Sequence, residues 1–333
     1  MISNTNEPKP PTRTSKIRHD QTMAILGNTT LDVFPLCFGG NVFGWTVDEP
    51  TAFEILDAYA AAGGNFIDTA DMYNSWLPDH PIGESEIMIG NWMKARGNRD
   101  TIVLATKISS LPSRKGLSAA NIAAATQDCL DRLQTDYIDV LYAHRDDLET
   151  PMLETMTAFN ELVTSGKVRY LGASNFTAER LQESLDVCAE HNLAKYSVLQ
   201  NNYNLMNRKE YEADVRAIVA KAGIAHAPYY GLASGFLTGK YRPGVEVDSQ
   251  RARGAAKMLD ARGLAVLAAL DEVAERHQVP VASVALAWLY AQPTIGAPIA
   301  SARTLEQLNE LLPMATLQLS DAELASLTAA SEI

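Results

Sequence analysis

Four polar residues with complementary chemistry stand just past short apolar runs of the chain. Asp68 and Tyr73 follow one run, and Lys107 and His144 follow two later ones. A tyrosine can act as a general acid, although its ordinary pKa of about 10 is high for that task at neutral pH. A nearby ammonium should lower the pKa of Tyr73, and a carboxylate beside the lysine should keep the lysine charged. These four residues, the tetrad, therefore indicate proton donation by Tyr73, with Lys107 as its activator and Asp68 as the partner of Lys107.

The order of apolar runs indicates how the tetrad could assemble. Short runs alternate with amphipathic helical stretches, which is typical of a parallel sheet wrapped by helices. In a (β/α)8 barrel the functional groups come from the C-terminal ends of several strands. The predicted fold is therefore α/β, a (β/α)8 TIM barrel. Its strands are expected near residues 35–38, 65–68, 102–106, 138–143, 169–172, 197–200, 224–228 and 294–299.

Three segments lie outside the eightfold repeat. Residues 23–33 alternate around a Gly-Asn turn and predict an N-terminal β-hairpin. Residues 320–323 read Ser-Asp-Ala-Glu, the pattern of a capping box, and predict an extra C-terminal helix. The long irregular segment at 230–254 is rich in Gly, Arg and Pro. A loop of that length in a compact domain is usually functional.

Composition and charge exclude several classes of partner. The chain has 333 residues, 47% of them apolar, with a formal net charge of −12 and a pI near 5.0. Nucleic acids and anionic membranes require a basic surface, so neither is expected as a main partner. No apolar stretch approaches the roughly 18 residues that a membrane span needs. A small-molecule partner is expected, and the oligomeric state stays open.

The cysteines and the N-terminus indicate the compartment and the domain limits. Cys37, Cys129 and Cys188 form no C-x-x-C pair and have no histidine at metal-ligand spacing. This pattern predicts reduced, packed thiols in a cytoplasmic protein without a bound metal. Residues 1–20 lack the apolar core of a signal peptide and are expected to form a mobile tail. Residues 21–333 contain no linker and are predicted to form a single domain.

The strings around the tetrad resemble those of bacterial NADP-dependent aldo/keto reductases. The resemblance is carried by Phe-Ile-Asp-Thr-Ala at 66–70, Gly-Glu-Ser-Glu at 83–86 and Ala-Thr-Lys at 105–107, and it extends over residues 23–325. It implies reduction of an aldehyde or ketone to an alcohol, reversibly, by direct hydride transfer and without a metal. In that reaction Tyr73 would protonate the alkoxide, and His144 would orient the substrate carbonyl.

No G-x-G-x-x-G segment follows the first expected strand, so the expectation of NADP(H) as cofactor rests on the resemblance. Residues 172–176 and 200–205 match segments that bind the nicotinamide carboxamide, and Tyr229 matches the aromatic residue that stacks on the nicotinamide ring. Residues 232–241 match the pyrophosphate loop, and 301–307 match the segment that holds the adenosine phosphate. The implied cofactor-binding residues are Ser174, Asn175, Gln200, Tyr229, Leu232, Ser234, Gly235, Lys240, Ser301, Arg303 and Gln307.

Two positions depart from the family pattern. Tyr230-Gly231 stands where the family has Ser-Pro, and Leu311 stands where it commonly has an asparagine against the adenine. The pyrophosphate loop is therefore expected to follow a different path. Arg303 could fork onto a 2′-phosphate, but the choice between NADPH and NADH stays open. A bulky or partly apolar carbonyl compound is expected as substrate, in a pocket lined by Phe43, Trp45 and Trp76.

Other roles are open for these residues. Taken singly, each tetrad residue has a common structural role, and their joint occurrence at strand ends is what favours catalysis. Asn175 could also cap the helix ahead of Thr177, a role that can coexist with cofactor binding. The same barrel could serve as a cofactor-binding, redox-sensing regulatory subunit. Lys107 could also be the Schiff-base nucleophile of an isomerase or aldolase.

Overall fold

Parallel strands surrounded by helices form the described part of the chain, which comprises residues 23–78, 80–247 and 252–332 of this computed structural model. The expected tail, residues 1–20, lies outside the described residues. One sheet of eight strands occupies the centre, and every neighbouring pair in it is parallel. In spatial order the strands are β11 (Ala225–His226), β10 (Tyr196–Gln200), β9 (Val168–Ser174), β8 (Ile138–Ala143), β5 (Val103–Ile108), β4 (Phe66–Asp68), β3 (Cys37–Gly39) and β12 (Ile299–Ala300).

Backbone hydrogen bonds join the edge strand β11 to the segment just ahead of β12 and close the sheet into a barrel. His226 N donates to Thr294 O at 2.8 Å, and Gly296 N donates to His226 O at 2.8 Å. This arrangement confirms the predicted (β/α)8 barrel. The last strand is a correction, because the sequence predicts it at 294–299 whereas β12 begins only at residue 299. Residues 294–296 contact β11 through these bonds without forming a regular strand.

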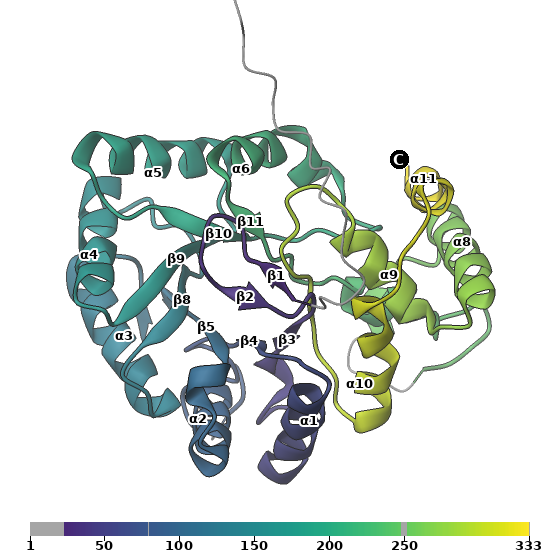
Figure 1. The fold of residues 1–333 in the computed structure, drawn as a ribbon, viewed down its shortest axis with the longest axis horizontal. Helices are drawn as coiled ribbons and strands as arrows, with labels where there is room; N and C mark the ends of the chain where they lie inside the picture. The colour runs from purple at the N-terminus through teal and green to yellow at the C-terminus, as the bar shows by residue number, and fades with distance from the viewer. Residues whose placement is uncertain (1–22, 79, 248–251, 333) are drawn as a thin grey trace, which may run out of the picture.

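The helices surround the strands (Figure 1). The first of them illustrates the pattern: Asp48 caps it by accepting from Thr51 N, and the apolar positions of its stripe face the barrel. The described helices are α1 (Glu49–Ala61), α2 (Glu84–Arg96), α3 (Ala119–Leu133), α4 (Met152–Thr164), α5 (Ala178–His191), α6 (Arg216–Ala222), α7 (Ala252–Ala256), α8 (Ala261–His277), α9 (Val281–Tyr290), α10 (Leu305–Leu311) and α11 (Asp321–Ala330).

Side chains on each strand alternate between two apolar layers. In β8, Val140 and Tyr142 point into the barrel, while Leu141 and Ala143 pack against the helices. All six residues of β8 are buried, as expected for a parallel strand covered on both faces. Burying one large apolar side chain contributes about 1.5–3 kcal/mol. The two layers together hold the strand ends at fixed positions.

A hairpin covers the N-terminal end of the barrel. Strands β1 (Ala24–Ile25) and β2 (Asp32–Val33) pair antiparallel, as predicted for residues 23–33, and lie across the strands in Figure 1. Gly27 in the turn has a φ of 58°, a conformation that glycine adopts without strain. Leu26 is fully buried within the inner apolar layer. The functional end of the barrel is therefore the opposite, C-terminal one.

The C-terminal helix is present as predicted. In α11 the side chain of Ser320 accepts from Glu323 N, and the side chain of Glu323 accepts from Ser320 N, which completes the capping box. This helix packs against α8 outside the eightfold repeat (Figure 1). The segment expected to be irregular at 230–254 contains a short 3-10 stretch, Ala233–Thr238, and the start of α7. Residues 248–251 of that segment lie outside the described residues.

Candidate active site

Two tetrad side chains, those of Asp68 and Tyr73, contact the ammonium group of Lys107 at the C-terminal end of the barrel. Lys107 Nζ donates to Asp68 Oδ2 at 2.5 Å and to Tyr73 OH at 2.9 Å. It also donates to the main-chain oxygen of Thr69 at 2.7 Å. Asp68 is the last residue of β4 and Lys107 lies near the end of β5, so adjacent parallel strands bring them together. The structure thus assembles the group that the sequence predicts.

Backbone pairing continues past β4 and holds the loop that carries Tyr73. Thr69 N donates to Ala105 O at 2.9 Å, and Asp71 N donates to Lys107 O at 3.0 Å. These bonds extend the β4–β5 ladder beyond the regular strand. The position of Tyr73 relative to Lys107 is therefore fixed by main-chain geometry as well as by the side-chain contact.

The charges in this group follow from burial and close contact. Lys107 has no exposed surface. Burial opposes its charge, but the adjacent carboxylate of Asp68 outweighs that effect and raises the pKa of Lys107 above its usual value. Lys107 is therefore an ammonium group at neutral pH.

The pKa of Tyr73 corrects one expectation from the sequence. Burial raises the pKa of Tyr73 to about 12, although Lys107 acts in the lowering direction as predicted. Loss of solvation by the phenolate is the larger effect, and Asp68 adds to it. The phenol consequently carries its proton at neutral pH and is a proton donor.

His144 completes the tetrad as a neutral imidazole. It follows β8, and its ring meets the Tyr73 ring edge-on at a centroid distance of 6.2 Å. Burial, with the charges of Lys107 and Arg145, holds the pKa of His144 well below its usual value. Its Nδ1 is buried and has no hydrogen-bond partner among the described residues. A neutral ring with unused hydrogen-bonding capacity can orient a carbonyl oxygen near Tyr73.

Gln200 has a contact that sequence reasoning missed. It ends β10 and is 2% exposed, and its Nε2 donates to Asp68 Oδ1 at 2.9 Å. The two oxygens of Asp68 are thus held by Gln200 and Lys107. The sequence could not reveal this pair, because the two residues are 132 positions apart. Carboxamide binding by Gln200 stays a prediction.

Ser174, Asn175 and Tyr229 form a connected polar chain beside the tetrad. Tyr229 OH donates to Asn175 Oδ1 at 2.7 Å. Asn175 Nδ2 donates to His144 O at 2.9 Å and to Ser174 Oγ at 3.0 Å. The alternative that Asn175 caps the next helix is wrong, because Thr177 caps α5 by accepting from Arg180 N. The predicted nicotinamide-side residues therefore lie together at the ends of β9 and β11.

The predicted pyrophosphate loop has an unusual backbone. Ala233, Ser234 and Gly235 have consecutive φ values of 48°, 57° and 92° after Leu232. Ala233 N donates to Tyr230 O at 2.7 Å and Gly235 N to Leu232 O at 2.8 Å, so internal hydrogen bonds hold this tight turn. A Cβ added at Gly235 would lie 4.0 Å from Lys240 Nζ, so the lysine head lies beside this stretch. Within the described part of the chain, Lys240 forms no ion pair with a carboxylate.

The segment at 301–307 contains the second set of residues that is predicted to bind a phosphate of the cofactor. Ser301 Oγ donates to Asn41 Oδ1 at 2.7 Å, and Arg303 N donates to Gln307 Oε1 at 2.9 Å. The Arg303 guanidinium pairs with no carboxylate among the residues that the structure describes. Leu311, one of the two departures from the family pattern, is 3% exposed and packs in the core.

The expected substrate wall is only partly present. Trp45 and Trp76 meet edge-on at a centroid distance of 5.9 Å, and Trp76 is 47% exposed. Phe43 is a correction, because it is fully buried and stacks on Phe38 at 5.6 Å. Its apolar side chain therefore belongs to the core. Its carbonyl oxygen accepts from Asn74 Nδ2 at 2.7 Å and so ties the two tryptophan-bearing loops together.

A buried polar cluster behind the tetrad was also missed. Thr69 Oγ1 and Ser85 Oγ are 2.8 Å apart, and Glu86, with no exposed surface, accepts from Arg132 Nε at 2.6 Å. Burial and then the charge of Glu86 raise the pKa of Asp71 to about 7. The available signal was the Gly-Glu-Ser-Glu string at 83–86, which the sequence analysis used only as part of the family resemblance. This cluster fixes the loop after β4.

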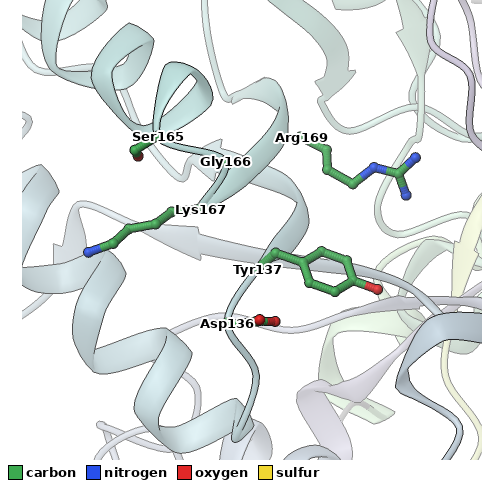
Figure 2. A pocket seen from close by; sticks show the side chains of 6 residues that line it. All are labelled: Asp136, Tyr137, Ser165, Gly166, Lys167 and Arg169. Carbon is green, nitrogen blue, oxygen red and sulfur yellow. The ribbon is translucent and has the colours of Figure 1, made fainter.

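A polar hollow elsewhere on the surface is separate from this site. Figure 2 shows the hollow, which is lined by Asp136, Tyr137, Ser165, Gly166, Lys167 and Arg169. Its residues precede β8 or begin β9, so it lies at the N-terminal end of the barrel. Arg169 is paired there with Asp139 at 2.8 Å. The tetrad, by contrast, is at the C-terminal end, where barrels of this kind carry their active sites.

The described residues offer neither a membrane span nor a metal site. None of the described helices is both long and apolar enough to cross a membrane. No group of three or more His, Cys, Asp or Glu side chains in the described ranges could hold a metal ion. The cysteines, Cys37, Cys129 and Cys188, are free and buried.

Comparisons with known proteins agree with this geometry. Residues 35–332 match the model of the aldo/keto reductase family. The chain is 34% identical to norsolorinic acid reductase B of Dothistroma septosporum, over 90% of this chain and 78% of that protein. It is 31% identical to protein tas of Escherichia coli, over 92% and 96% of the two chains. It is also 33% identical to an Arabidopsis thaliana protein named "Probable voltage-gated potassium channel subunit beta", over 86% and 88%. With the barrel, the tetrad and a family match over nearly the whole described chain, this protein belongs to the aldo/keto reductase family.

Proposed function

We propose that this oxidoreductase reduces an aldehyde or ketone to an alcohol with NADPH, by reversible direct hydride transfer. The observation that carries the proposal is the chain of contacts from Gln200 through Asp68 and Lys107 to Tyr73 OH. It presents one protonated phenol, backed by a buried ammonium, at the end of the barrel where substrates bind. General acid catalysis of this kind contributes about 10² to 10⁴-fold to a rate.

The described residues suggest how the proton moves. The neutral ring of His144 holds the substrate carbonyl oxygen near Tyr73 OH. As negative charge develops on that oxygen, Tyr73 donates its proton. Lys107 then stabilises the phenolate, since its ammonium already contacts Tyr73 OH at 2.9 Å. Asp68 keeps Lys107 charged throughout, and the reverse sequence serves alcohol oxidation.

The residues present fit a dinucleotide with several phosphates. In a chain with a net charge of −12, Lys240 and Arg303 carry positive charges without a carboxylate partner among the described residues. The left-handed stretch at 233–235 brings the backbone at Gly235 beside the Lys240 head, so a phosphate bound by Lys240 would lie against this turn. These residues would hold the phosphates, and Asn175 and Tyr229 would hold the nicotinamide. The bound cofactor supplies the hydride. Arg303, which can bind a phosphate with two parallel hydrogen bonds, favours NADPH over NADH.

The substrate class follows from the mouth of the site. Trp45 and Trp76 form an apolar, partly exposed edge on the loops after β3 and β4. A bulky or partly apolar carbonyl compound fits such an edge better than a small polar one. The three buried, free cysteines suit a reducing compartment, which supports a cytoplasmic location.

A second candidate is a cofactor-binding, redox-sensing regulatory subunit. The similarity to the Arabidopsis protein whose name places it with a potassium channel favours this alternative. Turnover separates the two functions. A catalytic rate far below about 1 s⁻¹ on every carbonyl compound tested, with tight NADPH binding, would support the regulatory role.

The surroundings of Lys107 argue against the alternative in which it is the Schiff-base nucleophile of an isomerase or aldolase. A Schiff-base nucleophile needs a lowered pKa, so that the neutral amine is present. Lys107 instead has a raised pKa, no exposed surface and three oxygen partners. Its role is therefore electrostatic.

A substrate screen tests the proposal directly. Aldehydes, ketones and alcohols of increasing apolar size are incubated with NADPH, NADH or their oxidised forms, and the absorbance of the reduced nicotinamide is followed. We expect NADPH-dependent reduction of bulky aldehydes, faster than with NADH. A preference for NADH would refute the NADPH assignment, and a lack of dinucleotide binding would refute the function.

A further inference from the structure

Tyr230 combines features that ordinary packing does not explain. Its backbone φ is 56°, in the left-handed region that bulky side chains rarely adopt. The residue is nevertheless 51% exposed, although its side chain is large. A left-handed tyrosine costs folding free energy, and an exposed ring returns little of it. Such strain is typical of functional sites.

The surrounding structure holds the backbone of Tyr230 in this conformation. Its carbonyl oxygen accepts from Ala233 N at 2.7 Å and from Asn204 Nδ2 at 2.9 Å. Asn204 is itself 2% exposed. The next residue, Gly231, packs so tightly that a Cβ there would come within 3.1 Å of Leu286 Cδ2. The conformation is therefore built into the fold.

The ring of Tyr230 lies next to the residues around the reaction centre. It meets the ring of Tyr229 at a centroid distance of 5.1 Å and an angle of 72°. Tyr229 OH donates a hydrogen bond to Asn175 Oδ1, and Asn175 Nδ2 donates one to His144 O. On its other side, two residues separate Tyr230 from the left-handed stretch beside Lys240. Tyr230 thus lies between the nicotinamide-side and the phosphate-side residues.

We propose that Tyr230 is a cofactor-binding residue whose ring covers the dinucleotide where its nicotinamide and pyrophosphate halves join, and so slows its release. This inference rests on the proposed function. The Tyr230 ring is half exposed while its backbone is held in the left-handed region. A tyrosine ring supplies a large, rigid contact surface at little entropic cost. The strain is retained because the ring acts on the cofactor.

The test compares two substitutions with opposite effects on the ring and the strain. Tyr230→Asn removes the ring but suits the left-handed region, whereas Tyr230→Phe keeps both ring and strain. For each protein, quenching of fluorescence gives the NADPH dissociation constant, stopped flow gives the release rate, and heating without ligand gives the unfolding midpoint. We expect Tyr230→Asn to weaken NADPH binding by on the order of tenfold, through faster release, with an equal or higher midpoint. Tyr230→Phe should match the wild type.

Different results would overturn the inference about Tyr230 and the proposed function. A fall in both affinity and unfolding midpoint in Tyr230→Asn would mean a structural role and would overturn the inference. Unchanged NADPH affinity with a raised KM for the aldehyde would assign the ring to the substrate and overturn it as well. Gln278→Asn is the matched control, because Gln278 also has a φ of 56° but ends α8; its NADPH affinity should not change. Failure of the wild type to bind any dinucleotide would refute the proposed function itself.

Discussion

Replacing Asp68 with asparagine tests the electrostatics of the site most severely. The variant keeps the side-chain shape but removes the carboxylate that Lys107 Nζ contacts at 2.5 Å and Gln200 Nε2 at 2.9 Å. Lys107 is fully buried and Asp68 is 2% exposed, so the ammonium is left without a counter-charge. Removal of one partner from a buried ion pair costs about 3–5 kcal/mol. We expect a loss of that size in the free energy of unfolding.

The loss should depend on pH in a definite direction. In the wild type the folded pKa of Lys107 is raised above its usual 10.5, so its contribution is fully present below about that pH and is lost only as pH rises through the folded pKa. Between pH values of about 6 and 9 this contribution is constant. In Asp68→Asn, burial acts alone and lowers the folded pKa below the unfolded one. The unfolded chain then binds more protons, so the variant should become more stable as pH rises.

Urea unfolding, followed by tryptophan fluorescence at about pH 6 and pH 9, measures both effects. Glu272→Gln is the control, because Glu272 and Arg276 form an exposed pair with side chains 70% and 53% accessible. Such a pair contributes about 0.3–0.5 kcal/mol. If Asp68→Asn loses no more than this control, or loses the same amount at both pH values, the buried-pair account is wrong.

Two further predictions concern the cofactor and the buried cluster. Arg303→Ala should weaken NADPH binding by about 10- to 150-fold and leave NADH unchanged, because a hydrogen bond to a charged group contributes about 1.5–3 kcal/mol. Fluorescence titration checks this, and equal losses for both cofactors would assign Arg303 to the pyrophosphate or the fold. Asp71, whose folded pKa is raised to about 7, destabilises the wild type increasingly as pH rises toward that value. Unfolding of Asp71→Asn should therefore show a stability gain that grows from pH 5 to pH 8, and a constant difference would contradict the burial of a charged Asp71.

Patterns of neighbouring residues were sufficient to predict the features of this molecule that depend on short stretches of sequence. Alternating apolar runs predicted the barrel, because strand and helix periodicities are properties of neighbouring residues. The meeting of Asp68 and Lys107 followed because parallel strand ends share one edge. The hairpin and the capping box of α11 were predicted for the same reason: their patterns span only a few residues.

Features that depend on tertiary packing could not be predicted. The pKa of Tyr73 rises because of its surroundings, which no string reveals. Gln200 meets Asp68 only because the barrel brings distant strands β10 and β4 within reach of one carboxylate. Phe43 resembles a pocket residue in sequence, but the stacking on Phe38 places it in the core. The left-handed backbone of Tyr230 likewise depends on contacts with Asn204 and on the packing of its neighbour.

The central claim is that Tyr73 donates the proton during carbonyl reduction. Single-turnover reduction of a good aldehyde substrate by NADPH, compared between the wild type and Tyr73→Phe, tests it most directly, because this assay isolates the chemical step. The phenyl ring keeps the edge-on contact with His144 but has no proton to donate. The account predicts a rate lower by about 10² to 10⁴-fold, with the NADPH dissociation constant nearly unchanged. A Tyr73→Phe variant that retains more than about a tenth of the wild-type rate would contradict it.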